Sequence, residues 1–152
     1  MPAIARMLGR LYDAVDCDEM PAGVAESIAR HAGIPVYSGL DGPEHPMRAL
    51  ADLMSICEHR AREDGGATVL FAGDAFTQRG DAFVRLAELL GIGLTITASS
   101  PQAADDAALL VDATDPVHWT LHAPAGPIDE AERNENYRYV VQAILISTLI
   151  GS

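Results

Sequence analysis

Cysteine is scarce in this sequence, which contains only Cys17 and Cys57 among 152 residues. The two lie far apart in the chain, so neither the C-x-x-C spacing of a redox motif nor the clustered ligands of a zinc site is present. A domain held together by disulfides is therefore not expected. We interpret both residues as reduced, mostly buried side chains of a cytoplasmic protein.

Long apolar runs are also absent. The most apolar segment, residues 139–150, includes polar Gln142, Ser147 and Thr148, and it is shorter than the roughly 20 residues that a membrane-spanning helix needs. Near the amino terminus Arg6 and Arg10 interrupt the apolar residues, and no apolar block precedes a small-residue cleavage site. We therefore expect no membrane association, no signal peptide and a cytoplasmic location.

Basic residues are few: 10 stand against 22 acidic residues, which gives a net charge of −12. The negative field repels the phosphate backbone of nucleic acids, so a nucleic-acid-binding function is not expected. It also repels small anions unless basic side chains gather at one site. With 49% hydrophobic residues, the chain can still bury an apolar core as one domain or two small lobes.

Apolar periodicity and the positions of glycine and proline divide the chain into alternating helices and strands. Helices are expected over residues 2–11, 21–32, 46–60, 80–90 and 129–150. Strands are expected over residues 12–17, 34–37, 67–72, 94–98, 108–111 and 117–121. The alternation is typical of an α/β fold, and we predict parallel sheet layers with flanking helices.

Residues 38–46 are rich in glycine, aspartate and proline, which indicates a loop and a boundary between two small lobes. We predict a first lobe over residues 1–42 and a second over residues 43–152. The helices 46–60 and 129–150 are expected to bridge them, the second by returning to the first lobe. Ligands of open parallel sheets bind beyond the carboxyl ends of the strands, and the segments expected there are 18–20, 38–45, 73–79 and 122–127.

Five motifs, in order along the chain, suggest a relationship to a known family. They are I-A-R-M-L-G-R-L-Y-D (4–13), A-G-I-P-V-Y-S-G-L (32–40), H-P-M-R-A-L-A-D-L (45–53) followed by Glu58-His59, V-L-F-A-G-D (69–74) and E-N-Y-R-Y-V-V-Q-A-I (135–144). Together they cover most of the chain and resemble motifs of the aspartate/ornithine carbamoyltransferases. The resemblance implies a first lobe of the carbamoyl-phosphate-binding type and a second lobe of the amino-acid-binding type.

Several positions that match the family's functional residues differ here. The arginine after the first strand falls on Asp18, the glutamine of H-P-x-Q on Arg48, and the arginine of E-N-R on Tyr137, next to Arg138. The catalytic cysteine position falls on Ala123. Family enzymes are roughly twice this length, as two ordinary domains require, and their S-T-R-T-R phosphate loop has no counterpart. The resemblance therefore implies a shortened member that has lost most of its carbamoyl phosphate site.

Candidate site residues follow from these matches and from the expected strand ends. We predict His45, Asp74 and His122 as catalytic residues, with His45 donating a hydrogen bond to a substrate carbonyl oxygen. The residues predicted to contact the substrate are Asp18, Arg48, Tyr137 and Arg138.

Structural roles compete with these interpretations. His45 could cap the helix that follows it, Asp74 could cap a turn, and Arg48 could pair with Glu44 or Asp52. His118 and His122 lie on one face at a spacing that a metal could use, with Asp112 or Asp115 as a third ligand. Surface or core positions are the simpler interpretation of both histidines, and we predict neither a metal nor a cofactor.

These observations favour a repurposed enzyme of the carbamoyltransferase family that acts on another small-molecule substrate. Two alternatives stay open: a non-catalytic subunit or binding partner, and a carbamoyltransferase completed by a second chain. Loss of the front half would leave an apolar surface that must be covered. We therefore expect a homo-oligomer, which the resemblance implies to be a trimer, or a heteromer with a chain that covers the missing half.

Overall fold

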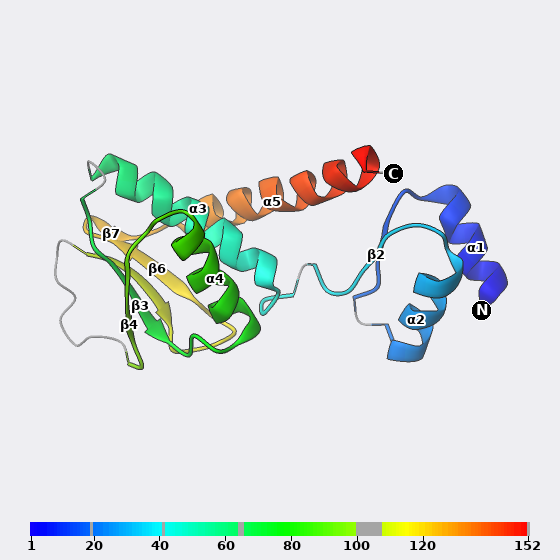
Figure 1. The fold of residues 1–152 in the computed structure, drawn as a ribbon, viewed down its shortest axis with the longest axis horizontal. Helices are drawn as coiled ribbons and strands as arrows, with labels where there is room; N and C mark the ends of the chain where they lie inside the picture. Colours follow the sequence, from blue (N-terminus) through cyan, green and yellow to red (C-terminus); the bar gives the residue numbers. More distant parts are fainter. Residues whose placement is uncertain (19, 41, 64–65, 100–107, 152) are drawn as a thin grey trace. The chain divides into compact units, whose positions relative to one another are not determined.

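The computed structural model describes residues 1–18, 20–40, 42–63, 66–99 and 108–151, and it has the α/β fold that the sequence predicts. The chain forms two compact units (Figure 1). Met1–Gly42 and Val141–Ser152 make up the first unit, and Pro43–Val140 makes up the second unit. The helix expected over residues 46–60 lies entirely in the second unit, whereas the long closing helix contributes residues to both.

Besides the second half of the closing helix, the described part of the first unit contains two whole helices and a pair of short parallel strands. These are α1 (Pro2–Leu11), β1 (Val15–Asp16), α2 (Ala22–His31) and β2 (Val36–Tyr37). Its core is small and consists of Ala5, Cys17, Ile28 and Ala32. Gly9 of α1 lies so near the end of α2 that a Cβ atom there would be 1.8 Å from the carbonyl oxygen of Ala32. The close approach of the two helices therefore requires glycine at this position.

A five-stranded sheet forms the centre of the second unit. Its strands are β3 (Val69–Gly73), β4 (Leu94–Thr97), β5 (Leu109–Ala113), β6 (Thr120–Ala123) and β7 (Gly126–Pro127), in the order β4-β3-β5-β6-β7. β3 is parallel to β4 and to β5, whereas β6 is antiparallel to both of its neighbours. The sheet is therefore mixed, with a parallel part and an antiparallel edge.

Three helices accompany this sheet: α3 (Pro46–Arg62), α4 (Gln78–Leu89) and the first half of α5 (Glu130–Ile150). α3 and α4 pack against each other, and their apolar side chains join those of the strands in the main core. Within this core the rings of Phe71, Phe83 and Trp119 have centroids 5.6, 5.5 and 6.0 Å apart. These contacts fix the orientation of the Trp119 ring just before β6.

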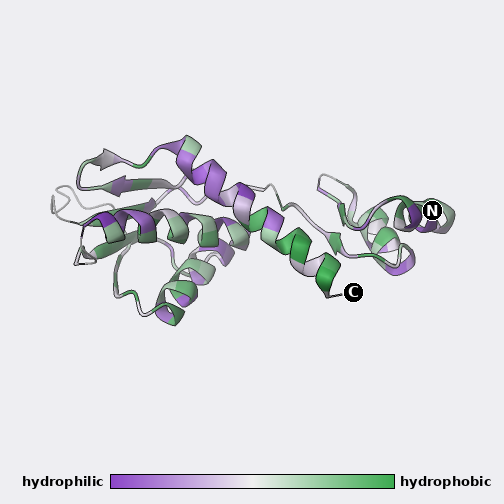
Figure 2. Cartoon of the chain, turned by 90° about the horizontal axis from the view of Figure 1, so that it is seen from above, coloured by the Kyte–Doolittle hydropathy of each residue, from purple (hydrophilic) through white to green (hydrophobic). Residues whose placement is uncertain are grey.

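The hydropathy of helix α5 changes along its length. Figure 2 shows a hydrophilic first half and a hydrophobic second half. In the first half Asn136 is buried and donates a hydrogen bond to Ser55 Oγ at 2.9 Å. In the second half the hydroxyl groups of Thr148 and Tyr37 are hydrogen-bonded within the first unit. Among the residues that the structure describes, no helix is long and apolar enough to cross a membrane.

Candidate functional site

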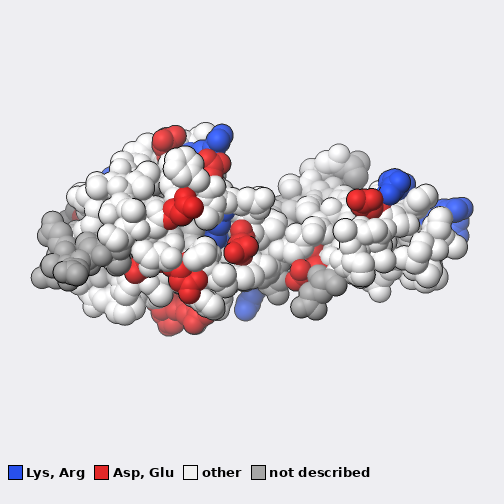
Figure 3. Space-filling view, turned by 90° about the horizontal axis from the view of Figure 1, so that it is seen from below, with Lys and Arg blue, Asp and Glu red and all other residues white. Residues whose placement is uncertain are grey.

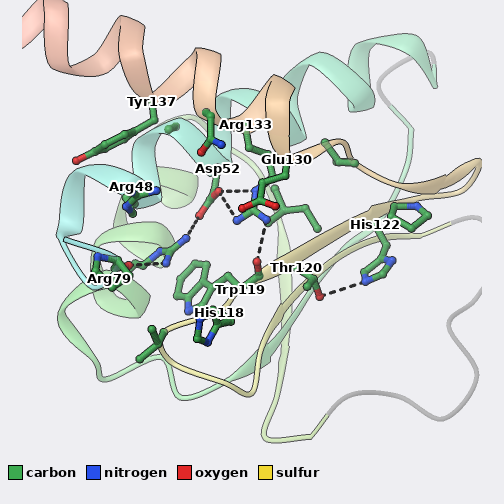
Figure 4. A pocket seen from close by; sticks show the side chains of 17 residues that line it. Arg48, Asp52, Arg79, His118, Trp119, Thr120, His122, Glu130, Arg133 and Tyr137 are labelled. Atoms are coloured by element: carbon green, nitrogen blue, oxygen red, sulfur yellow. Dashed lines mark hydrogen bonds and ion pairs between the residues drawn. The ribbon is translucent and has the colours of Figure 1, made fainter. Parts of the chain in front are cut away.

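The second unit contains a cavity of about 540 Å³ (Figure 4). Its wall comes from α3, α4, the segment around β6 and the first half of α5. The charged residues of the wall are Arg48, Asp52, Arg79, Glu130 and Arg133, and its apolar residues include Val117, Trp119, Leu121, Pro127 and Ile128. A cavity of this size, with a few charged groups in an apolar wall, is typical of a small-molecule site.

Asp52 joins three helices through two arginines. Its Oδ2 accepts a hydrogen bond from Arg79 Nη2 at 2.6 Å, and its Oδ1 accepts from Arg133 Nε and Nη2 at 3.1 and 3.0 Å. The Asp52 side chain is only 4% exposed. We call these three residues the Asp52 cluster; they connect α3, α4 and the start of α5. Because both carboxylate oxygens are used, the charge of Asp52 is well compensated in its buried position.

Each arginine of the Asp52 cluster also binds a backbone carbonyl. Arg79 Nη1 donates to the Pro43 oxygen at 2.6 Å, and Arg133 Nη1 donates to the Trp119 oxygen at 2.8 Å. The guanidinium of Arg79 lies over the Trp119 ring, 4.1 Å from its centroid. Both side chains are thus held in one geometry by partners within the protein, and they contribute mainly positive charge to the cavity wall.

Positive charge exceeds negative charge in the cavity wall. Three arginines face two carboxylates, those of Asp52 and Glu130. Burial lowers the pKa of Arg79, Asp52 opposes this shift, and the nearby charges of Arg133 and Arg48 lower the pKa further. Arginine nevertheless remains protonated in proteins. The cavity wall therefore carries positive charge close to an apolar surface.

Arg48 and Tyr137, two of the predicted substrate contacts, lie together in this wall. The guanidinium of Arg48 is 4.3 Å from the centroid of the Tyr137 ring, in the stacked arrangement that cation–π attraction favours. Tyr137 comes from α5 and is 7% exposed, whereas Arg48 comes from α3 and is half-buried. Of the two, Arg48 presents more of its surface to a ligand.

His45 and Asp74, two of the predicted catalytic residues, lie outside the cavity wall. His45 is the N-cap of α3, and its Nδ1 accepts a hydrogen bond from the Met47 N–H at 3.2 Å. Asp74 is exposed after β3, where its Oδ1 accepts from the Phe76 N–H at 2.8 Å. Both side chains therefore have the structural contacts that compete with a catalytic interpretation.

His122, the third predicted catalytic residue, belongs to the cavity wall. Its Nε2 lies 3.2 Å from Thr120 Oγ1. The prediction that residues 122–127 follow the carboxyl end of a parallel strand is wrong, because His122 lies within β6, opposite Leu110 in an antiparallel pair. In Figure 4, His122 lies on the opposite side of Trp119 from Arg48 and Arg79.

The remaining two predicted contacts are Asp18 and Arg138. Asp18 belongs to the first unit, so it is not part of the wall formed within the second unit. Arg138 is exposed and is also outside the wall. One residue along a helix turns a side chain by about 100°, which explains why Tyr137 faces the cavity and Arg138 does not.

His118 also lines the cavity, at its open rim. Its Nδ1 is 3.3 Å from Asp115 Oδ2. Hydrogen bonds from the backbone N–H groups of Val117 and His118 lower the pKa of Asp115. Asp112 accepts from Thr114 instead. In the described part of the chain, no group of three His, Cys, Asp or Glu side chains is placed to hold a metal ion.

Sequence patterns did not identify Arg79, Arg133 and Trp119 as site residues, and they presented Asp52 only as a possible partner of Arg48. Arg79 does fall in the segment 73–79 that was expected beyond a strand end. The only further clue was the scarcity of basic residues: all ten are arginines, and three of them meet in this cavity.

No protein-family model matches the chain. The resemblance to the carbamoyltransferases therefore depends on the five motifs and stays a prediction.

Proposed function

We propose that this chain is a carbamoyltransferase-like protein adapted to another small molecule, and that its second unit binds a carboxylate-bearing ligand of the amino-acid type. The observation that supports this proposal is the meeting of Arg48, Arg79 and Arg133 in one cavity of a chain with a net charge of −12. On the face drawn in Figure 3, acidic side chains are scattered over the second unit. Gathered arginines overcome that field locally, and charge-assisted hydrogen bonds to a carboxylate are among the strongest available.

The contact between positions 48 and 137 supports both the kinship and the change of ligand. By resemblance, the family has a neutral amide at the first position and an arginine at the second. Here the arginine comes from α3 and stacks on a tyrosine from α5. The cavity thus keeps a cation while losing the amide that would contact a carbamoyl group.

Carbamoyl phosphate fits this arrangement poorly. Arg79 and Arg133 already donate to Asp52 and to backbone carbonyls, and their side chains are only 5% and 15% exposed, so they offer a phosphate little accessible hydrogen-bonding surface. We therefore propose that this chain alone does not transfer a carbamoyl group, and that His118 and His122 would supply any acid–base chemistry in the cavity.

The first prediction concerns ligand binding to the ¹⁵N-labelled protein. Trp119 is the only tryptophan, so its indole N–H gives a single NMR cross-peak that reports on the cavity. We expect a saturable shift with acetate and L-aspartate, and no saturation by carbamoyl phosphate below millimolar concentration. Arg48→Gln should weaken carboxylate binding at least about tenfold, since a charge-assisted contact contributes about 1.5–3 kcal/mol.

Arg85→Gln is the matched control, because Arg85 lies on the exposed side of α4 and pairs with Asp81 outside the cavity. It should bind like the unmodified protein. Sub-millimolar binding of carbamoyl phosphate would contradict the proposed change of ligand. Absence of any carboxylate-induced shift would contradict the site itself.

A second proposal is that the chain works as a subunit of a homo-oligomer or of a heteromer. Large apolar side chains are exposed on two helices of the first unit. On α1 they are Ile4, Met7 and Leu11, which recur at helical spacing, and on α5 they are Ile146, Leu149 and Ile150. Such contiguous apolar positions are typical of surfaces that another chain covers.

A further inference from the structure

We infer that the first unit binds a small aliphatic ammonium ion in a second cavity, which shares no residue with the arginine-lined cavity of the second unit. This cavity has a volume of about 300 Å³ and is lined by residues 14–16, by Tyr37 and Leu40, and by Val141 and Leu145. All of them belong to the first unit. The volume lies at the lower end of the ~300–1,000 Å³ range of small-molecule sites, so it suits a ligand of few atoms.

Two strands and one helix of the first unit form the wall of this cavity. β1 contributes Asp16, β2 contributes Tyr37, and the second half of α5, which is hydrophobic (Figure 2), contributes Val141 and Leu145. Val141 and Leu145 are four residues apart, so they lie on one face of the helix. A hydrogen bond between the hydroxyl groups of Tyr37 and Thr148 holds the Tyr37 ring in this wall.

Asp16 provides a carboxylate that a ligand can reach. Its Oδ1 accepts a hydrogen bond from the Gly39 N–H at 2.9 Å, and its Oδ2 accepts from the Leu40 N–H at 3.0 Å. These two bonds fix the orientation of the carboxylate but do not neutralise its charge. An ionised carboxylate has about four lone-pair sites, so each oxygen can accept a further donor. Asp16 is an exposed residue, and an N–H donor of a ligand therefore has access to it.

The charge of the wall favours a cation. No basic side chain lines the cavity, and no ion pair within the described residues involves Asp16. The net charge of −12 adds a field that attracts cations and repels anions. The face of the Tyr37 ring also attracts a cation. An ammonium group can donate to the carboxylate and lie near this ring at the same time.

The rest of the wall favours an aliphatic ligand over a bare cation. Leu40 is buried, Val15 and Val141 are half-buried, and Leu145 is exposed. A short alkyl chain covers apolar side chains of this kind, and each CH₂ group that it buries strengthens binding by about fourfold. A metal ion is a poor alternative, because Ca²⁺ and Mg²⁺ need more oxygen ligands than one carboxylate supplies.

The test compares three probes on the full ¹⁵N-labelled chain at pH 7. They are n-butylammonium, its neutral counterpart 1-butanol, and methylammonium, which keeps the charge and lacks the chain. The amide cross-peaks of Gly39 and Leu40 report on the cavity, because both N–H groups bond to Asp16. We expect a saturable shift with millimolar n-butylammonium, and affinity at least about tenfold greater than that of either other probe.

Asp16→Asn should reduce n-butylammonium affinity at least about tenfold, because an amide carries no charge to attract the cation. Asp13→Asn is the matched control. It changes the net charge by the same amount, but Asp13 is exposed and lies outside the cavity wall, so it should change the affinity less than about twofold. The probe comparison needs only the unmodified protein, so it decides the question even if Asp16→Asn misfolds.

The opposite results would overturn the inference. Equal binding of 1-butanol would mean that the carboxylate does not select the ligand, and equal binding of methylammonium would mean that the apolar wall does not. Equal losses in the two variants would assign binding to the general negative field. None of these results affects the proposed function, because its reporter, Trp119, lies in the second unit. If n-butylammonium binds and carboxylates leave the Trp119 cross-peak unchanged, only the proposed function fails.

Discussion

At the scale of single residues, Asp52 connects the two most buried arginines of the cavity wall. Its one carboxylate holds two arginines that arise from different helices, and it does so almost entirely out of contact with water. A buried ion pair adds little net stability compared with apolar residues of the same shape, but removal of one partner leaves the other charge uncompensated. The geometry of the wall therefore depends on all members of the Asp52 cluster being present together.

Asp52→Asn should lower the free energy of unfolding by about 3–5 kcal/mol, because two buried guanidinium groups lose their counter-charge. Urea denaturation measures the change. Asp81→Asn is the matched control: Asp81 pairs with Arg85 on the exposed side of α4, and its loss should move the urea midpoint little. Equal effects of the two substitutions would contradict the importance assigned to the Asp52 cluster.

His45→Ala tests whether His45 acts on the ligand or on the helix. Loss of the cap at the start of α3 should reduce the free energy of unfolding by about 0.5–2 kcal/mol. Carboxylate binding, followed through Trp119, should persist because His45 is outside the cavity wall. A stable variant that no longer binds the ligand would restore the prediction that His45 contacts substrate.

The site residues that were predicted from the sequence belong to local motifs. Those that were missed make contacts with residues that are distant along the chain. Arg48 was found because it lies within a local motif. Asp52 is 27 residues from Arg79 and 81 residues from Arg133, and no short pattern records contacts over such distances. Position 137 was identified by resemblance, but its stacking with Arg48 follows only from the packing of α5 against α3.

At the scale of helices and strands, local patterns predicted the helices and the parallel pairing of β1–β2, β3–β4 and β3–β5, and they missed the antiparallel edge formed by β6 and β7. The helix expected over residues 2–11 is α1 with the same bounds, and α4 begins at Gln78 because Thr77 Oγ1 accepts a hydrogen bond from the Gly80 N–H. The strand expected over residues 117–121 overlaps β6 only at Thr120 and Leu121, and a local pattern contains no information on the direction of a strand. β7 was missed because Gly126 and Pro127 form too short a segment to show any periodicity.

The contact between α1 and α2 gives a prediction at this scale. Gly9→Ala would place a Cβ atom against the Ala32 carbonyl, a backbone group that cannot move without shifting the helix. We expect a loss of about 1–3 kcal/mol from overpacking. Urea denaturation followed by NMR signals of Ile28 reports on the first unit.

Gly23→Ala is the control for this substitution, since no atom lies within 4 Å of a Cβ atom built there. It should be neutral or stabilise by up to about 1 kcal/mol through the unfolded chain. If the two alanine variants are equally stable, α1 and α2 do not pack as closely as described.

For the whole molecule, the exposed apolar positions of α1 and α5 predict association. Light scattering on the purified protein should give a mass greater than the 16.1 kDa of one chain. Ile4→Glu together with Leu11→Glu should shift the mass toward the monomer, because charged side chains at both exposed positions oppose burial. A monodisperse 16.1 kDa species in the unmodified protein would contradict the proposal of a homo-oligomer.

The Asp52 cluster has an evolutionary consequence as well. A substitution of Asp52, Arg79 or Arg133 alone leaves a buried charge without its partner, and selection against unstable proteins removes such intermediates. The three positions can diverge only through compensated steps. In descendants of a common ancestor they should therefore be inherited as a set, or be replaced together by uncharged residues, while other arginines such as Arg30 drift independently.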